Sequence, residues 1–261
     1  MRMLAVAWLL VVVAAVVLLP LVLPAPNALW LDDGLVAPGL HHILGTDELG
    51  RDLLSRLVTG ARSSALIAVS AAALAMMLGT VLGAVAGYRG GSVDAIVRVA
   101  IDLFWSVPFV VFVVLVVSVV GVSPLSLALT LGCINWVSPA RVVRLEVTRL
   151  RTLPFVTRAR AGGAGHVEVL RREIFPVLAP TLRALTIWCA AEALTVETSL
   201  AFLGLSAPPP TPSWGALIAT GLAYVSSAPW LVSAPAIAVV ATLGSLQVLA
   251  RSFDQTSARK G

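Results

Sequence analysis

Two glutamates, Glu192 and Glu197, stand within an apolar stretch of the sequence, residues 177–204. If this stretch crosses a membrane, each carboxyl group is costly there and by default marks a functional site. About 140° separates the two around a helix, so they cannot share one narrow face. We expect one to line a translocation path and the other to face a neighbouring helix. Thr198 and Ser199 adjoin Glu197 as further path or gate candidates, the alternative being structural hydrogen bonds.

The other chemically versatile residues exclude several kinds of site. The chain has three histidines and two cysteines, namely His41, His42, His166, Cys133 and Cys189. They cannot supply the usual Cys/His zinc sets and no HExxH motif occurs, so we predict no metal site and no catalytic residue. The one lysine is followed only by the last residue, which rules out a GxxxxGK[ST] phosphate loop and ATP hydrolysis by this chain. We expect the adjacent histidines to be solvated and both cysteines to be small core residues.

The composition identifies the elements that must position these residues. Hydrophobic residues make up 59% of the chain and charged residues 12%, against roughly 45–50% and about 25% in soluble domains. A helix needs about 20 apolar residues to cross a bilayer. The apolar runs predict an all-α membrane protein with six transmembrane helices, at about 3–23, 65–87, 99–120, 124–140, 177–204 and 228–250. The third and fourth form a hairpin, and the first is too long for the core of a cleaved signal peptide.

The arginines predict the orientation, because cytoplasmic loops retain basic residues. With the N-terminus inside, the inner segments hold Arg2, two arginines after the second helix, nine between Arg141 and Arg183, and three basic residues at the C-terminus. Fifteen of the 18 basic residues are then cytoplasmic. Both termini should face the cytoplasm, and the basic charge needs no nucleic-acid partner.

The loop between the fourth and fifth helices, residues 141–176, is too polar to enter the bilayer and too long for a simple connection. Pro154 and the Gly162–Gly163 pair interrupt it, so we expect one or two short helices lying along the membrane face, with Gly163 at positive φ. The predicted divisions are a first helix at 1–25, an extracytoplasmic segment at 26–61, a five-helix core at 62–250 that contains this loop, and a cytoplasmic tail at 251–261.

Two smaller patterns predict contacts within the core. Gly79, Gly83 and Gly87 recur every four residues, so one helix face lets another backbone approach closely. Packing inside this chain is the favoured interpretation, and contact with a second chain is the alternative. Arg98 and Asp102, four residues apart, are expected to form an ion pair.

Three sequence blocks carry a family resemblance. They are LGTDELGRDLLSR at 44–56 with GARS at 60–63, ARAGGA at 159–164 with IFP at 174–176, and ETSLAFLGL at 197–205 with PPPTPSWG at 208–215. In this order they resemble the C-type permease subunits of dipeptide/oligopeptide/nickel ABC importers. Thr157 stands where that family usually has a glutamate.

The resemblance implies a type I ABC importer permease fold and a non-catalytic subunit of a transporter in the bacterial plasma membrane. It implies as partners a homologous second permease, ATPase subunits with two nucleotide-binding domains that hold ATP and Mg, and an extracytoplasmic substrate-binding protein. The expected ATPase-coupling residues are Phe155, Arg158, Ala159, Gly163, Ala164, His166 and Pro176. The outer loop that includes Pro210, Pro212 and Trp214 is expected to receive the binding protein.

Two alternatives remain open from the sequence. The cargo of related importers includes nickel and haem as well as peptides. An autonomous, proton-coupled secondary transporter would explain a carboxyl group within the membrane, but it would not explain the nine arginines between Arg141 and Arg183.

Overall fold

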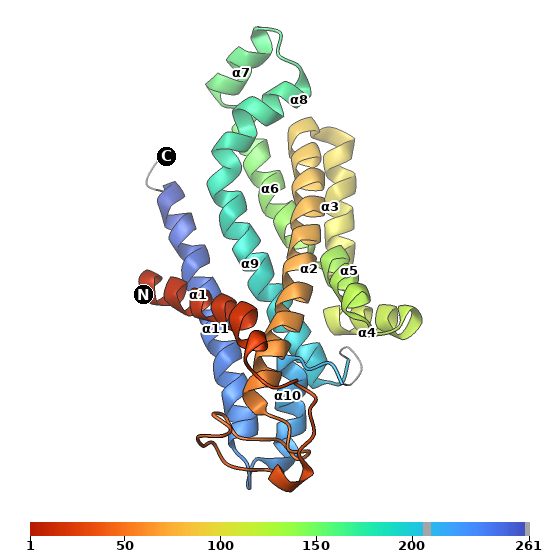
Figure 1. Ribbon diagram of the computed structural model, residues 1–261. Helices are drawn as coiled ribbons and strands as arrows, with labels where there is room; N and C mark the ends of the chain where they lie inside the picture. Colours follow the sequence, from red (N-terminus) through yellow and green to blue (C-terminus); the bar gives the residue numbers. More distant parts are fainter. Residues whose placement is uncertain (206–209, 259–261) are drawn as a thin grey trace.

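A computed structural model describes residues 1–205 and 210–258 and shows a bundle of long helices (Figure 1). Within these residues no strand occurs, and the only β-type pairing is an isolated bridge between Thr46 and Asp52. The α-helices are α1 (Arg2–Leu18), α2 (Leu53–Arg89), α3 (Gly91–Ser106), α4 (Phe109–Val120), α5 (Pro124–Asn135), α6 (Val137–Leu150), α7 (Pro154–Ala161), α8 (His166–Val169), α9 (Phe175–Phe202), α10 (Trp214–Gly221) and α11 (Trp230–Ala258). The all-α prediction is confirmed.

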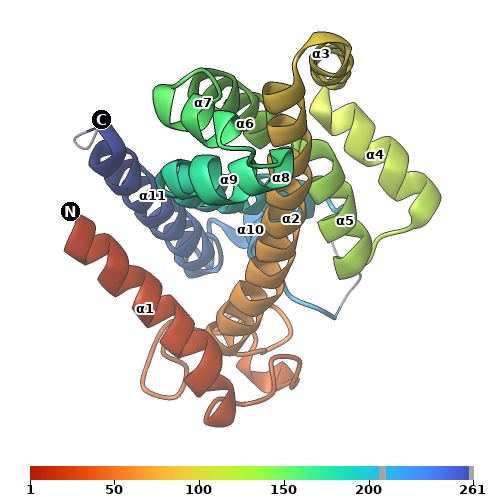
Figure 2. The ribbon, with the colours of Figure 1, turned by 90° about the horizontal axis from the view of Figure 1, so that it is seen from above.

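The long helix α2 lies at the centre of the bundle, with α5 on one side and α6, α9 and α11 on the other (Figures 1 and 2). A short π-helical turn, Leu170–Ile174, joins α8 to α9. The first helix, α1, runs obliquely across α11 (Figure 1), where the Trp8 indole donates a 3.1 Å hydrogen bond to the Thr242 hydroxyl. The Arg2 guanidinium lies 5.7 Å from the Phe253 ring, so the start of α1 is beside the C-terminal part of α11.

Among the described residues, four helices are long and apolar enough to cross a membrane, or five if the bent pair α3 and α4 counts as one span. The four correspond to the first, second, fifth and sixth predicted helices. The predicted hairpin is less regular than expected, because α3 and the apolar part of α4 meet at an angle of 89°. Pro108 lies at this bend, where proline disfavours a helical conformation at the residue before it. The predicted fourth helix is divided into α5 and α6 at Trp136, so the count of six stays a prediction.

The glycine face of α2 packs inside the chain, against α6. A Cβ atom on Gly83 would lie 2.5 Å from the Ala140 carbonyl oxygen, and one on Gly87 would lie 2.5 Å from the Arg144 carbonyl oxygen. Only glycine permits so close an approach of the two backbones. The Arg144 guanidinium also forms a 2.6 Å ion pair with Asp94, which attaches α3 to the same face of α6.

The first sequence block, residues 44–56, folds as a turn that begins α2. Gly45 and Gly50 both have positive φ, and a Cβ on Gly50 would overlap the Trp30 carbonyl. The Asp47 carboxylate accepts hydrogen bonds from the backbone N–H groups of Leu49 and Arg51. The Asp52 carboxylate caps α2 by accepting from the Ser55 N–H at 2.8 Å. The block is therefore a structural unit at the end of the bundle opposite α7 and α8 (Figure 1).

Three expectations about single residues differ from the structure. His42 is not simply solvated, because its Nδ1 lies 2.9 Å from the Asp52 carboxylate. Arg98 pairs with Asp94 instead of Asp102, since its Nε lies 3.3 Å from the Asp94 carboxylate. Cys189 is buried as expected, but Cys133 is exposed. In a helix that is apolar all round, the sequence does not tell which side faces outward.

Candidate functional site: a projecting helical turn and a cavity in the bundle

The loop at 141–176 divides into the end of α6 and a helical turn made of α7 and α8, which projects beyond the bundle (Figure 1). We call residues 154–174 the projecting segment. Pro154 begins α7 at the first position of the helix, where its missing N–H costs nothing and its fixed φ suits the helix. The break expected at Gly162–Gly163 is present, because α7 ends at Ala161.

A Schellman motif ends α7 and turns the chain into α8. Gly163 has a φ of +88°, as the sequence predicted. Its N–H donates to the Arg160 carbonyl at 3.0 Å, and the Ala164 N–H donates to the Ala159 carbonyl at 3.1 Å. Ala159 and Ala164 occupy the two positions that commonly make the hydrophobic contact of this motif, and both pack against the same apolar cluster. The block ARAGGA is therefore explained by the geometry of one turn.

An apolar cluster holds the projecting segment against the bundle. Val156, Val169 and Ile174 are each 0% exposed and pack with residues of α2, α6 and α9. Among the expected coupling residues, Phe155, Ala159 and Ala164 are partly buried against this cluster. The others are exposed: Arg158, Gly163, His166 and Pro176. The segment thus has one face fixed to the bundle and one face free in this chain.

Tyr88, near the C-terminal end of α2, links that helix to the projecting segment. The rings of Tyr88 and His166 meet edge to face with centroids 5.6 Å apart, and the Arg160 guanidinium lies 5.9 Å from the Tyr88 ring. The Arg151 guanidinium donates to the Tyr88 carbonyl at 3.1 Å. Sequence reasoning did not identify Tyr88, although it is one of only two tyrosines in the chain.

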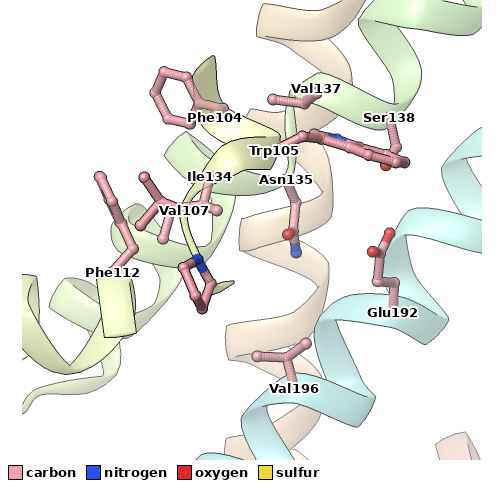
Figure 3. A pocket seen from close by; sticks show the side chains of 11 residues that line it. Phe104, Trp105, Val107, Phe112, Ile134, Asn135, Val137, Ser138, Glu192 and Val196 are labelled. Carbon is pink, nitrogen blue, oxygen red and sulfur yellow. The ribbon is translucent and has the colours of Figure 1, made fainter. Parts of the chain in front are cut away.

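A cavity of about 330 Å³ lies where α9 faces the α3–α4 bend and the α5–α6 junction (Figure 3). Glu192 of α9 and Asn135 of α5 both project into it (Figure 3). One carboxyl oxygen of Glu192 and the amide nitrogen of Asn135 are buried, and neither has a hydrogen-bond partner among the described residues. The other lining is mostly apolar and includes Phe104, Phe112 and Val196. The sequence did not lead us to name Asn135 as a candidate site residue, although it is a polar amide in a long uncharged run.

The other path candidates do not join Glu192 in this cavity. Glu197 is only 2% exposed and Thr198 is also buried, whereas Ser199 is exposed and donates to the Thr195 carbonyl of its own helix. Both carboxyl oxygens of Glu197 are buried without a hydrogen bond to a described residue. The Ser64 side chain of α2 interacts with this carboxyl.

The described end of the outer loop, residues 212–215, packs against the bundle. Trp214 is 3% exposed, and its indole N–H donates to the Leu57 carbonyl of α2 at 3.1 Å. Pro212 is buried and Pro210 is exposed, while the expected residues 208 and 209 lie outside the described part of the chain. A Cβ on Gly215 would lie 2.1 Å from the Thr198 carbonyl, so α10 approaches α9 closely. The conspicuous PSWG sequence thus has a packing role.

No group of three or more potential ligand side chains gathers in a metal-like cluster within residues 1–205 and 210–258. The two features that remain as functional candidates are the projecting segment at one end of the bundle and the cavity with Glu192 and Asn135.

Comparison with known proteins identifies the family. The family described as "Binding-protein-dependent transport system inner membrane component" matches residues 79–259. An oligopeptide transport system permease protein, OppC, of Haemophilus influenzae is 34% identical over 206 residues, which are 78% of this chain and 65% of that protein. This chain therefore spans just under two thirds of the length of that relative.

Two further relatives agree with this assignment. A putative peptide transport system permease protein of Brucella suis is 36% identical over 245 residues, or 92% of this chain and 80% of the relative. OppC of Bacillus subtilis is 31% identical over 212 residues, or 81% of this chain and 70% of the relative. Together with the apolar helices of the bundle, these matches show that the chain is a multi-pass membrane protein and belongs to the family of binding-protein-dependent transport system inner membrane components.

Proposed function

We propose that this chain is a permease subunit of an ATP-driven importer of dipeptides or oligopeptides in the bacterial plasma membrane. It pairs with a homologous second permease, and the two enclose a path that opens alternately to either side. Two nucleotide-binding domains of a separate ATPase bind ATP and Mg, and an extracytoplasmic binding protein delivers the peptide. The relatives named above, which are called oligopeptide or peptide permeases, support the choice of cargo.

The observation that carries this proposal is the construction of the projecting segment. A subunit without a nucleotide site needs a rigid element on which a separate ATPase can act. The buried face of the segment packs on α2, α6 and α9, and its exposed face carries Arg158 and His166. Force applied to that face would therefore reach three long helices together.

The same arrangement supports a cytoplasmic position for both termini. The basic loop 141–176 lies toward the end of the bundle opposite residues 22–52, which hold the acidic residues Asp32, Asp33, Asp47, Glu48 and Asp52 (Figure 1). With the projecting segment in the cytoplasm, the C-terminal part of α11 is expected on the same side, and the start of α1 with it, because Arg2 lies beside Phe253. The divisions 1–25, 26–61 and 62–250 then correspond to a peripheral first helix, an outer segment and the permease core.

Reconstitution of the complete transporter tests this function. In liposomes with the second permease, the ATPase and the binding protein, uptake of labelled peptide should require ATP and every subunit. Gly163→Pro should leave membrane insertion intact but uncouple ATP hydrolysis from uptake, because proline cannot adopt the positive φ and loses the N–H bonded to Arg160. Normal uptake by this variant would remove the projecting segment from its role.

Nickel and haem are the alternative cargoes within the same family, and competition by unlabelled peptide, nickel ion or haem in this assay distinguishes them. A proton-coupled secondary transporter is the alternative from another class, and the unpaired carboxyl of Glu192 is the observation in its favour. If the purified chain alone accumulated solute against a gradient in response to a proton gradient, the ATP-driven function would be wrong.

A further inference from the structure

We propose that Glu192 and Asn135 form a transit site for the amino end of a peptide, inside the membrane-spanning part of the chain. The Glu192 carboxylate would bind the terminal ammonium group, and the Asn135 amide would donate to the first peptide carbonyl. The inference rests on the proposed peptide import and adds to it a place and an orientation for the cargo.

The first reason for this proposal is that the Glu192 carboxyl group lacks a counter-charge within the described part of the chain. One of its oxygens is buried without a hydrogen-bond partner among the described residues. A carboxylate removed from water is strongly destabilised unless a cation or hydrogen-bond donors compensate it. No ion pair joins Glu192 to a basic side chain among the described residues, and the Arg141 guanidinium lies instead 5.5 Å from the ring of Trp105, which lines the cavity. A cationic group of a ligand can supply the missing counter-charge.

The second reason is the α5–α6 junction. Asn135 is only 9% exposed and its amide nitrogen has no partner among the described residues, although it faces the cavity (Figure 3). The helix is interrupted directly after it, and Pro139 has no N–H for the Asn135 carbonyl. Interrupted helices within membranes occur where they line a cavity and bind substrates. The junction therefore offers an unused amide donor within the same cavity as the unused carboxylate.

The combination of a carboxylate and an amide donor in one cavity favours one chemical class of ligand. The unpaired atom of the Asn135 amide is its nitrogen, a donor that does not bind a metal ion, and no cluster of three or more His, Cys, Asp or Glu side chains occurs within residues 1–205 and 210–258. An ammonium group followed by a carbonyl group, the feature common to all peptides with a free amino end, matches a carboxylate beside an amide donor. The cavity of about 330 Å³ is at the lower end of the roughly 300–1,000 Å³ usual for small-molecule sites. It can hold the end of a peptide against Phe104 and Phe112 while the remaining residues lie outside.

Transport by the complete complex tests the site first. Glu192→Gln preserves the shape and removes the charge, so uptake of tri-alanine should fall at least tenfold while ATP hydrolysis stimulated by the binding protein stays within twofold of wild type. Glu192→Asp should recover part of the uptake. Thr195→Val is the matched control on α9, because Thr195 is exposed and its hydroxyl bonds only to the Ala191 carbonyl of its own helix. Uptake by Glu192→Gln within twofold of wild type, or equal losses of uptake and ATP hydrolysis, would overturn the proposal.

A chemical cross-link tests the contact directly. Dicyclohexylcarbodiimide activates a carboxyl group, which condenses with an amine to an amide while the reagent takes up the elements of water and leaves as a urea. In the complex held in lipid nanodiscs, millimolar tri-alanine should become joined to Glu192, as detected by mass spectrometry. N-acetyl-tri-alanine, which has no free amine, should give no such adduct, and neither should the Glu192→Gln complex.

The outcomes separate this inference from the proposed function. Modification of Glu192 by the reagent without attachment of tri-alanine would overturn the transit site, as would a cross-link from Glu192 to a lysine of another subunit. A wild-type complex that takes up no tri-alanine would count against peptide import, while the cross-link would still decide whether the cavity binds an amino end.

Discussion

The positive φ of Gly163 allows a quantitative prediction for the projecting segment. The φ is +88°, and a Cβ atom at this position would have nothing within 4 Å. Gly163→Ala therefore introduces no clash, and its effect is confined to the backbone. An L-residue in the left-handed conformation costs roughly 1–2 kcal/mol relative to glycine. The variant should destabilise the turn between α7 and α8 by this amount, which corresponds to about a 5–30-fold shift toward the open turn.

Hydrogen exchange measures this shift in the assembled complex. The amides of Gly163 and Ala164, which bond to carbonyls of α7, should exchange about 5–30 times faster in the variant if local opening governs their exchange. The control is Gly165→Ala, because Gly165 is also free of neighbours within 4 Å but has a φ of −70°. Equal protection in Gly163→Ala and wild type, or equal losses in both variants, would refute the backbone argument. Peptide uptake per ATP hydrolysed should fall in Gly163→Ala alone.

Three further variants test the packing of the bundle in thermal unfolding of the purified chain. Gly83→Leu should destabilise by about 1–3 kcal/mol or more, because even a Cβ there would lie 2.5 Å from an α6 carbonyl. Gly244→Ala in α11, with nothing within 4 Å, should not destabilise and should gain up to about 1 kcal/mol of helix propensity. Asp94→Asn should cost about 1–3 kcal/mol, since it leaves the half-buried Arg144 guanidinium without its counter-charge, and Arg144→Gln in the same background should add little. Asp52→Ala should cost about 1 kcal/mol through the lost cap of α2, and unchanged melting would contradict that role.

The sequence predicted most of the long helices, because a charge-free run of sufficient length has one stable conformation in lipid. It also predicted the break at Gly162–Gly163, since proline and glycine act locally. The 89° bend between α3 and α4 was not predicted. Pro108 was visible, but a proline inside an apolar run is also compatible with a continuous, kinked helix, and only the packing of the neighbouring helices decides between them.

The candidate site was predictable only in part. Glu192 could be singled out because a carboxyl group among apolar residues is conspicuous. Asn135 could not be paired with it, since the two belong to different helices that only the tertiary structure brings together. The hydrogen-bond partners of Trp214 and Trp230 could not be predicted for a related reason. Their indole N–H groups donate to the backbone carbonyls of Leu57 and Thr46, more than 150 residues away along the chain.

The close contact of α2 with α6 limits which motions are open to this protein. A rotation or a partial slide of one helix along the other would bring a side chain larger than hydrogen against the opposite backbone at Gly79, Gly83 or Gly87. We therefore expect α2 and α6 to move together as one rigid body whenever the permease changes conformation. The neighbouring breaks in regular helix are the α3–α4 bend beside Pro108 and the interruption after Asn135, and we expect hinge motion there. Both breaks border the same cavity, so this rigid-body motion would change the shape of the space around Glu192.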